Sequence, residues 1–329
     1  MTILKNNAPV RATAVAARIA ILLALLGGFL TMGPRVRAAQ GGSGAPPVRF
    51  VADVPLLDCD GMPCVEARVN HGSPARLLID TGNQASIVDT QIAKDLGLNP
   101  YKPTQPHWPD GIFRAEVPTL QIGNLTLSHV PILTMDIASM TAQNQIAHAA
   151  GTLAYSAFKD RILQLDFRAH RLRVSEILSS PAPCHGPCDH FSLITFGKHG
   201  PPIVVARGFT INGRAVTAQI DTQYSGSLLV YTAAIDKLGL ANDAKGTETR
   251  TFPFTDGGVK MKFAAAREEG FDGTPLIASG AVVYFPTPGV HEPDALFDAT
   301  VGLELFRNTV LTLDFHDMTV SVHKTAAAG

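Results

Sequence analysis

The sequence has little charge and almost no excess of either sign. Charged residues make up 17% of the 329 positions, and 27 Lys and Arg against 28 Asp and Glu leave a formal net charge of −1. Proteins that bind nucleic acid or an anionic membrane surface through their overall charge carry an excess of basic residues. We therefore expect no nucleic-acid partner. Hydrophobic residues make up 46% of the chain, which indicates a globular protein, and the length allows about two domains.

Long hydrophobic runs are also lacking. The apolar segment at residues 19–32 is shorter than the roughly 20 residues that cross a bilayer. Basic residues precede it, and small residues suited to cleavage follow at 36–39. This pattern is typical of a secretory signal peptide, with an uncleaved anchor as the alternative. We predict a signal peptide at residues 1–39 and export to the periplasm or the medium, without stable membrane insertion after its removal.

Cysteine is scarce, and the four cysteines form two close pairs in the sequence. Cys59 precedes Cys64 by five positions, and Cys184 precedes Cys188 by four. In an exported chain, an even number of cysteines at short spacing favours disulfides. The alternative is a metal site built from the second pair and its two neighbouring histidines. That cluster has no second ligand pair at a distance, so we expect two disulfides and no metal.

An aspartate follows a strongly β-prone run in the first half of the chain. Leu77-Leu78-Ile79 leads directly into Asp80, Thr81 and Gly82, and Ser86 follows. A carboxylate at the mouth of a buried strand is costly, and chains place one there mostly for chemistry or for a buried hydrogen-bond network. Asp80 is therefore a candidate functional residue.

A second copy of this pattern lies 141 positions later (221 − 80 = 141). The run 216–220 leads into Asp221 and Thr222, and Ser227 follows. Other features recur in the same order, at offsets that drift only to 148. They are a hairpin before each aspartate, a short helix ending in Leu-Gly-Leu, and a closing strand at 163–167 and at 311–315. The chain is therefore predicted to be a duplicated β-rich unit.

The paired aspartates suggest one type of chemistry. Two carboxylates held a few ångströms apart cannot both ionise readily, so they share one proton. The ionised member can take a proton from a water molecule, while the protonated member donates to the carbonyl oxygen under attack. This is hydrolysis of an amide without a metal, a covalent intermediate or a cofactor.

Both halves resemble the retropepsin-like and pepsin-like aspartic peptidase superfamily, in particular exported bacterial relatives with two tandem units. The resemblance rests on Asp80-Thr81-Gly82, on Asp221-Thr222, on the Leu-Gly-Leu helix ends and on the closing segment 300–306. It covers residues 50–325 and implies an all-β fold with short helices. The expected architecture is a bilobal, acid-protease-like double β-barrel with pseudo-twofold symmetry. We predict an N-terminal lobe at 40–180, a linker at 181–190 and a C-terminal lobe at 191–325.

The resemblance also assigns roles to individual residues. Asp80 and Asp221 would form the catalytic dyad, and Thr81 and Thr222 would make hydroxyl-to-backbone hydrogen bonds between the lobes. Gly82 would allow the backbone to pass close to a carboxylate. The supporting set is Thr81, Gly82, Thr222, Ser86 and Ser227. A flap over the cleft is expected near residues 108–113.

One departure from the family pattern leaves two functional hypotheses open. Gln223 stands where the family has glycine, and a side chain there is expected to crowd the loop or change its backbone path, with Gly226 nearby to restore freedom. The first hypothesis is a monomeric aspartic endopeptidase acting on peptides or proteins. The alternative is a catalytically impaired pseudo-peptidase that binds peptides without cleaving them.

Overall fold

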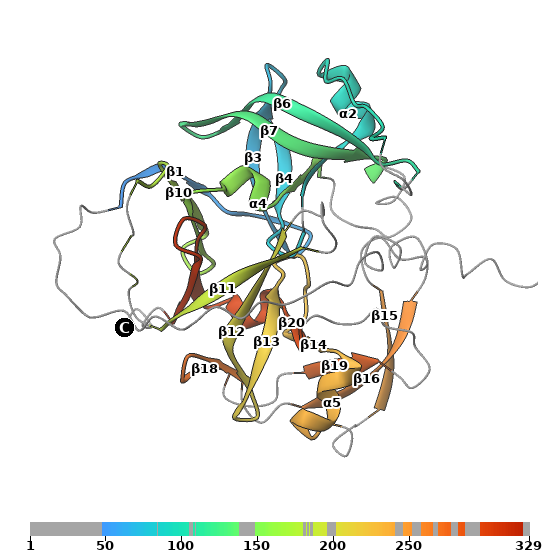
Figure 1. Ribbon diagram of the computed structural model, residues 1–329, viewed down its shortest axis with the longest axis vertical. Coiled ribbons are helices and arrows are strands. Elements are labelled where there is room, and N and C mark those ends of the chain that lie inside the picture. The colour runs from blue at the N-terminus through green and yellow to red at the C-terminus, as the bar shows by residue number, and fades with distance from the viewer. Residues whose placement is uncertain are drawn as a thin grey trace, which may run out of the picture.

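The structure is a computed structural model, and it describes most of the chain beyond the predicted signal peptide at residues 1–39. The described residues are 48–83, 85–104, 108, 110–137, 149–179, 182, 184, 187–195, 202–240, 246–251, 258–265, 269–277, 282–286 and 297–324. Two β-rich lobes lie one above the other, the first at the top of Figure 1 and the second at the bottom. Across these residues, none of the helices is both long and apolar enough to span a membrane.

The first lobe is built around a closed six-stranded barrel. Its strands follow the order β3-β4-β8-β5-β7-β6, and the ring closes because β6 also pairs with β3. β2 extends the sheet beyond β3. Alternate residues of β3 are buried in the barrel, as in a strand with one face on a core. The bounds are β2 (Leu57–Cys59), β3 (Met62–Val69), β4 (Ala75–Ile79), β5 (Ser86–Asp89), β6 (Phe113–Ile122), β7 (Leu125–Met135) and β8 (Gly151–Leu153).

The described strands of the second lobe follow a matching order. This order is β12-β13-β20-β14-β19-β16, and β17 pairs with β12 where β6 pairs with β3 in the first lobe. The pairs β16 with β19 and β17 with β18 therefore stand where the β6–β7 hairpin stands in the first lobe, and residues 266–268 and 278–281 between their members lie outside the described residues. β15 adds to the free edge of β16. The bounds are β12 (Pro202–Ile211), β13 (Arg214–Ile220), β14 (Leu228–Val230), β15 (Gly246–Thr251), β16 (Gly258–Ala265), β17 (Glu269–Phe271), β18 (Thr274–Ile277), β19 (Val282–Pro286) and β20 (Ala299–Val301).

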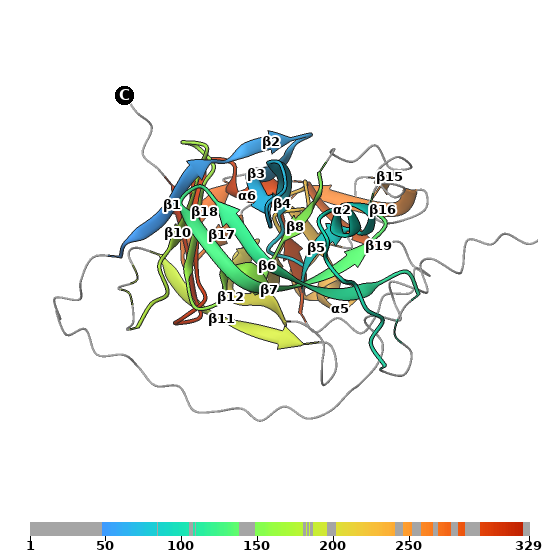
Figure 2. The same cartoon turned by 90° about the horizontal axis from the view of Figure 1, so that it is seen from above.

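A third, antiparallel sheet joins the lobes in the order β1-β10-β9-β21-β22-β11. In the view from above, β1 and β10 lie on the opposite side of the molecule from α2 and β15 (Figure 2). β11 links this sheet to the second barrel, because its first residues pair with β22 and its later ones with β12. The bounds are β1 (Phe50–Pro55), β9 (Ile162–Asp166), β10 (Arg171–Ser175), β11 (Cys188–Thr195), β21 (Thr309–Asp314) and β22 (Thr319–Lys324).

The centre of the joining sheet carries the twofold relation between the halves. β9 and β21 pair antiparallel, and Gln164 lies directly opposite Thr312. These two residues are 148 positions apart, which is the repeat offset of the closing strands. Gln164 is therefore paired with its own counterpart, and Gln164 Nε2 donates to Thr312 Oγ1 (3.2 Å). The fold is the all-β, two-lobed, acid-protease-like double barrel that the sequence predicts.

Short helices follow equivalent strands in the two lobes. Asp89 caps the first of them, and its Oδ1 accepts from the backbone N–H groups of Gln91 and Ile92. Gly97 and Gly239 each adopt a φ of +70° just after the helix, a conformation that glycine adopts without strain. The bounds are α2 (Thr90–Asp95), α4 (Tyr155–Phe158), α5 (Thr232–Leu238) and α6 (Leu303–Phe306).

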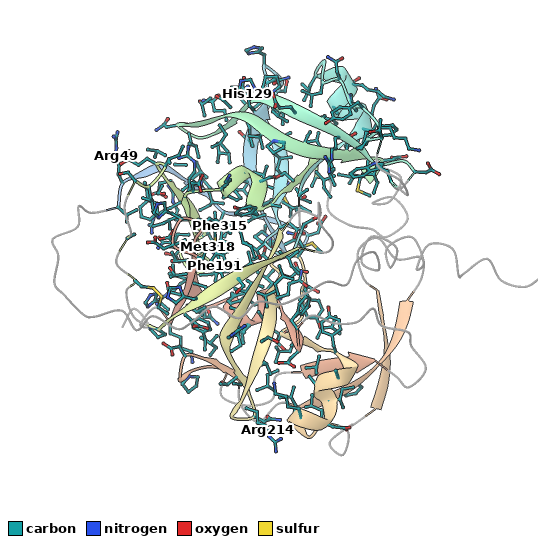
Figure 3. The ribbon with its side chains drawn as sticks, viewed as in Figure 1. Arg49, His129, Phe191, Arg214, Phe315 and Met318 are labelled. Atoms are coloured by element: carbon teal, nitrogen blue, oxygen red, sulfur yellow. A yellow bond between two sulfur atoms is a disulfide. The ribbon has the colours of Figure 1, made fainter. Side chains whose placement is uncertain are left out.

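One apolar core runs through both barrels and the joining sheet. Phe191 from β11 and Phe315, which follows β21, meet edge to face with ring centroids 5.7 Å apart. Figure 3 shows both rings with Met318 at the junction of the lobes. Because this core is continuous, the two lobes are packed together rather than only linked through the chain.

Both predicted disulfides are present. Cys59 is bonded to Cys64 and Cys184 to Cys188. The second bond consumes the thiolates that the alternative metal site would need, so that alternative is wrong. β11 begins at Cys188, so the last residues of the segment expected to be a linker are already strand.

Candidate active site

Two aspartate loops meet where the barrels face each other. Asp80 follows β4, and Asp221 follows β13. Each of these strands pairs in parallel with a short neighbour, β8 or β20. The backbone N–H of Asp80 donates to the Leu153 carbonyl (2.9 Å), and that of Asp221 donates to the Val301 carbonyl (3.0 Å). Equivalent bonds therefore hold both aspartates at the ends of equivalent strands.

The threonine after each aspartate binds the opposite lobe. Thr81 Oγ1 donates to the Ile220 carbonyl (2.9 Å). Thr222 Oγ1 donates to the Ile79 carbonyl (2.6 Å). The backbone N–H of each threonine donates to the hydroxyl of the other, at 3.2 Å and 3.1 Å. Both threonines are buried, so these bonds form without competition from water and fix one loop against the other.

Gly82 lies directly against the second aspartate. A Cβ added to Gly82 would lie 2.7 Å from Asp221 Oδ1 and closer still to the carboxyl carbon. Any side chain would therefore displace the carboxylate or the loop. The absence of a side chain at Gly82 lets the two aspartate loops come into contact.

The surroundings of the two carboxyl groups raise the pKa of both. Asp80 is buried, and this burial, together with the nearby charge of Asp221, raises its pKa to about 8. Asn83 opposes this shift, because its backbone N–H donates to Asp80 Oδ1 (2.8 Å). Burial also raises the pKa of Asp221, although the Gln223 backbone N–H donates to its Oδ1 (2.8 Å). Two carboxyl groups that interact electrostatically in this way titrate as a pair rather than independently.

Gln223 does not crowd its own loop. Its side chain crosses to the first lobe, where Nε2 donates to the Ile79 carbonyl (2.8 Å). Its φ lies outside the left-handed region, so this position does not require glycine. Gly226 makes room for the Tyr224 ring, because an added Cβ would lie 2.6 Å from the Tyr224 hydroxyl.

The two serines link each aspartate loop to a helix start. Ser86 Oγ accepts from the backbone N–H of Ala154 (3.0 Å) and from Ser156 Oγ (2.9 Å), at the beginning of α4. The Ser227 carbonyl accepts from the backbone N–H of Gly302 (2.8 Å), which precedes α6. Both serines are buried.

The region predicted to form the flap is described only in part. Trp108 Nε1 donates to the Ile112 carbonyl (2.6 Å), and the Arg114 guanidinium lies over the Trp108 ring at 4.9 Å. Residue 109 lies outside the described residues. The flap therefore stays a prediction.

Sequence reasoning missed one residue that reaches the Asp80 loop. Gln219, on β13, donates from Nε2 to the Gly82 carbonyl (2.7 Å). At the repeat offset of 141 its counterpart is Leu78, an apolar residue on β4. An alignment of the two repeats would have singled out Gln219, because a long polar side chain stands there in place of the buried leucine of the first repeat.

Comparisons with known proteins agree with the geometry of the first lobe. Residues 65–153, which include Asp80, match a family model described as aspartyl protease. No curated protein matches the chain.

Solved structures resemble the chain only distantly. A structure titled edgp is 11% identical, covers 85% of this chain and 96% of its own, and has a TM-score of 0.48. Basic 7S globulin from soybean is 10% identical, with 85% and 95% covered and a TM-score of 0.48. An aspartic proteinase from Irpex lacteus is 11% identical, with 84% and 97% covered and a TM-score of 0.46. We draw nothing from likenesses at this level.

Proposed function

We propose that the chain is an aspartic peptidase of the retropepsin-like and pepsin-like superfamily, and that it hydrolyses peptide bonds with Asp80 and Asp221 as its catalytic dyad. The match of residues 65–153 to an aspartyl protease family model supports this proposal. The observation that carries the proposal is the reciprocal bonding of Thr81 and Thr222, which holds the two aspartate loops face to face. The contact between Gly82 and the Asp221 carboxylate supports it. All these residues come from one chain, so the proposed site is complete in a monomer.

The proposed reaction uses the two carboxyl groups in different protonation states. We assign the proton to Asp80, whose pKa is raised to about 8, and the negative charge to Asp221. Asp221 takes a proton from a water molecule as the water oxygen attacks the peptide carbonyl carbon, and Asp80 donates its proton to the carbonyl oxygen. When the tetrahedral intermediate collapses, the amine leaves with the proton held by Asp221. Asp80 regains a proton from the hydroxyl that becomes the new carboxyl group.

The substrate class and the compartment follow from the family and from the cysteines. A peptidase of this superfamily acts on peptides or proteins, so we propose such a substrate. The two disulfides are compatible with an oxidising compartment, and we propose that the protein acts after export.

The test is digestion of a broad peptide library between pH 3 and pH 9. We expect the mature wild-type chain to cleave peptides, a statine-type inhibitor to block cleavage, and both Asp80→Asn and Asp221→Asn to lose at least 100-fold in kcat/KM. Asp166→Asn is the matched control, because this buried aspartate lies in β9, where its Oδ1 accepts from the Ala169 N–H. Full activity in either dyad variant would remove the assignment.

One observation favours the alternative of a peptide-binding pseudo-peptidase. Gln223 replaces the family glycine directly beside Asp221 and binds the opposite lobe. If this substitution has abolished catalysis, the wild type binds peptides from the library without cleaving them, and Gln223→Gly restores cleavage. Cleavage by the wild type would exclude the alternative.

A further inference from the structure

Two glutamines of the second lobe reach across to the peptide units on either side of Asp80. Gln223 Nε2 donates to the Ile79 carbonyl, and Gln219 Nε2 donates to the Gly82 carbonyl. The first carbonyl belongs to the peptide unit that enters Asp80. The second belongs to the peptide unit that joins Gly82 to Asn83.

The equivalent positions of the first lobe cannot make either of these bonds to the second lobe. At the repeat offset of 141, the counterparts of Gln219 and Gln223 are Leu78 and Gly82, and neither has a side-chain donor. The reciprocal threonine bonds are therefore symmetric, but the glutamine bonds run only from the second lobe to the Asp80 loop. Duplication alone does not account for this asymmetry.

Gln219 acts on the Asp80 carboxylate through a single peptide unit. The carbonyl of Gly82 accepts from Gln219, and the N–H of Asn83, in the same planar unit, donates to Asp80 Oδ1 (2.8 Å). Accepting a hydrogen bond at the carbonyl polarises an amide and strengthens its N–H as a donor. The planarity of the unit also means that fixing the carbonyl fixes the direction of the N–H.

The second lobe also orients the Gln219 amide. Thr300 Oγ1 lies 3.4 Å from Gln219 Oε1 as a donor, and the Tyr231 hydroxyl lies 3.1 Å from Thr300 Oγ1. With its oxygen directed to Thr300, the amide presents its NH₂ group to the Gly82 carbonyl. A chain of polar groups thus runs from Tyr231 to the Asp80 loop.

We propose that Gln219 is a positioning residue that orients and strengthens the Asn83 N–H bond to Asp80. This inference rests on the proposed function of the dyad. Gln223 does not share this role, because the N–H of the peptide unit that it binds belongs to Asp80 and donates to the Leu153 carbonyl. The bond from Gln219 acts on the peptide unit that binds the carboxylate.

The proposal predicts a direction for the pH profile. The Asn83 N–H stabilises the ionised form of Asp80, so weakening this donor favours the protonated form and raises the pKa of the group. The fall in kcat/KM at high pH, where the pair loses its proton, then moves upward. A residue that only held the lobes together would lower stability or activity without moving this limb.

The test compares Gln219→Met, Gln223→Met and Thr300→Val in the full mature chain. Methionine keeps the length of the side chain without an amide, and valine keeps the shape of threonine without a hydroxyl. Thr312→Val is the matched control, because it removes the Gln164–Thr312 bond, which also crosses between the lobes but does not touch the aspartate loops. The readouts are the pH profile of kcat/KM and the titration of the Asp80 carboxyl carbon by ¹³C NMR.

We expect Gln219→Met to move the high-pH limb and the Asp80 titration upward by roughly 0.5 to 1 pH unit. Thr300→Val should give a smaller shift in the same direction, and Gln223→Met and Thr312→Val should give none. If Gln219→Met does not fold, the sign of the Thr300→Val shift decides the question. An unchanged Asp80 titration in folded Gln219→Met or Thr300→Val would overturn the proposal, as would an equal shift in Thr312→Val. A wild type without activity would refute the proposed function instead, and the NMR titration would still test the positioning role.

Discussion

Replacement of Asp80 by asparagine should make the protein more stable at neutral pH. Burial and the Asp221 charge raise the pKa of Asp80 from 3.8 to about 8 in the folded chain. A carboxyl whose folded pKa is raised contributes stability that is fully present below its unfolded pKa and is lost as the pH rises through its folded pKa. Between pH 5 and pH 7 the unfolded chain has released this proton and the folded chain has kept it.

The magnitude follows from one proton. A difference of one bound proton lowers the free energy of unfolding by about 1.4 kcal/mol per pH unit, which gives about 3 kcal/mol between pH 5 and pH 7. This slope depends on the folded pKa lying above the range, not on its exact value. Asparagine is neutral in both states and has nearly the shape of a protonated aspartate, so Asp80→Asn removes the slope. Its stability relative to wild type should therefore rise by about 3 kcal/mol over this interval.

The assay is urea unfolding followed by circular dichroism at pH 5, 6 and 7 and at constant ionic strength, with the disulfides intact. Thr312→Val serves as the control, because it changes a contact between the lobes without changing a titratable group, and its effect should be the same at each pH. If the free energy of unfolding changes equally with pH in wild type and in Asp80→Asn, Asp80 is not protonated in the folded chain. That result would also remove the assignment of the shared proton to this residue.

Other perturbations test separate parts of the site. Gly82→Ala places a Cβ against the Asp221 carboxylate, so we expect at least 100-fold lower kcat/KM and about 1–3 kcal/mol lower stability in urea unfolding; near-normal activity would contradict the contact. Thr81→Val removes the donor to the Ile220 carbonyl and should cost about 1–3 kcal/mol by the same measurement, more than a surface Thr→Val change. Since the proton on Asp80 is lost as the pH rises through about 8, kcat/KM should be retained at pH 7 and fall above pH 8 in a pH-rate profile; a fall already complete at pH 6 would contradict the raised pKa.

Duplication made much of the fold predictable from the sequence. A single apolar run that leads into Asp-Thr is compatible with many structures. Because the run occurs twice, with other features repeated in the same order, it predicts two equivalent strands related by a twofold axis. The helix ends were readable for the same reason, because Gly97 and Gly239 each stand where the chain needs a positive φ. The pairing of Gln164 with Thr312 then follows from the offset of the closing strands.

The parts that escaped prediction depend on packing between the copies. The residues of its own loop alone predict that Gln223 crowds that loop. The space and the hydrogen-bond acceptor for its side chain lie in the other lobe, at the Ile79 carbonyl. A local pattern does not contain that partner.

The two halves are alike in fold but not in the environment they give their aspartates. Asp80 is buried, and its loop receives side-chain bonds from two glutamines of the other lobe, whereas Asp221 is only half-buried. In a perfectly symmetric pair the shared proton has equal affinity for both carboxyl groups. Deeper burial of one member disfavours its charged form and so places the proton there. The two glutamines of the second lobe thus act mainly on the first lobe, where they hold in place the loop that carries the carboxyl group assigned as the acid.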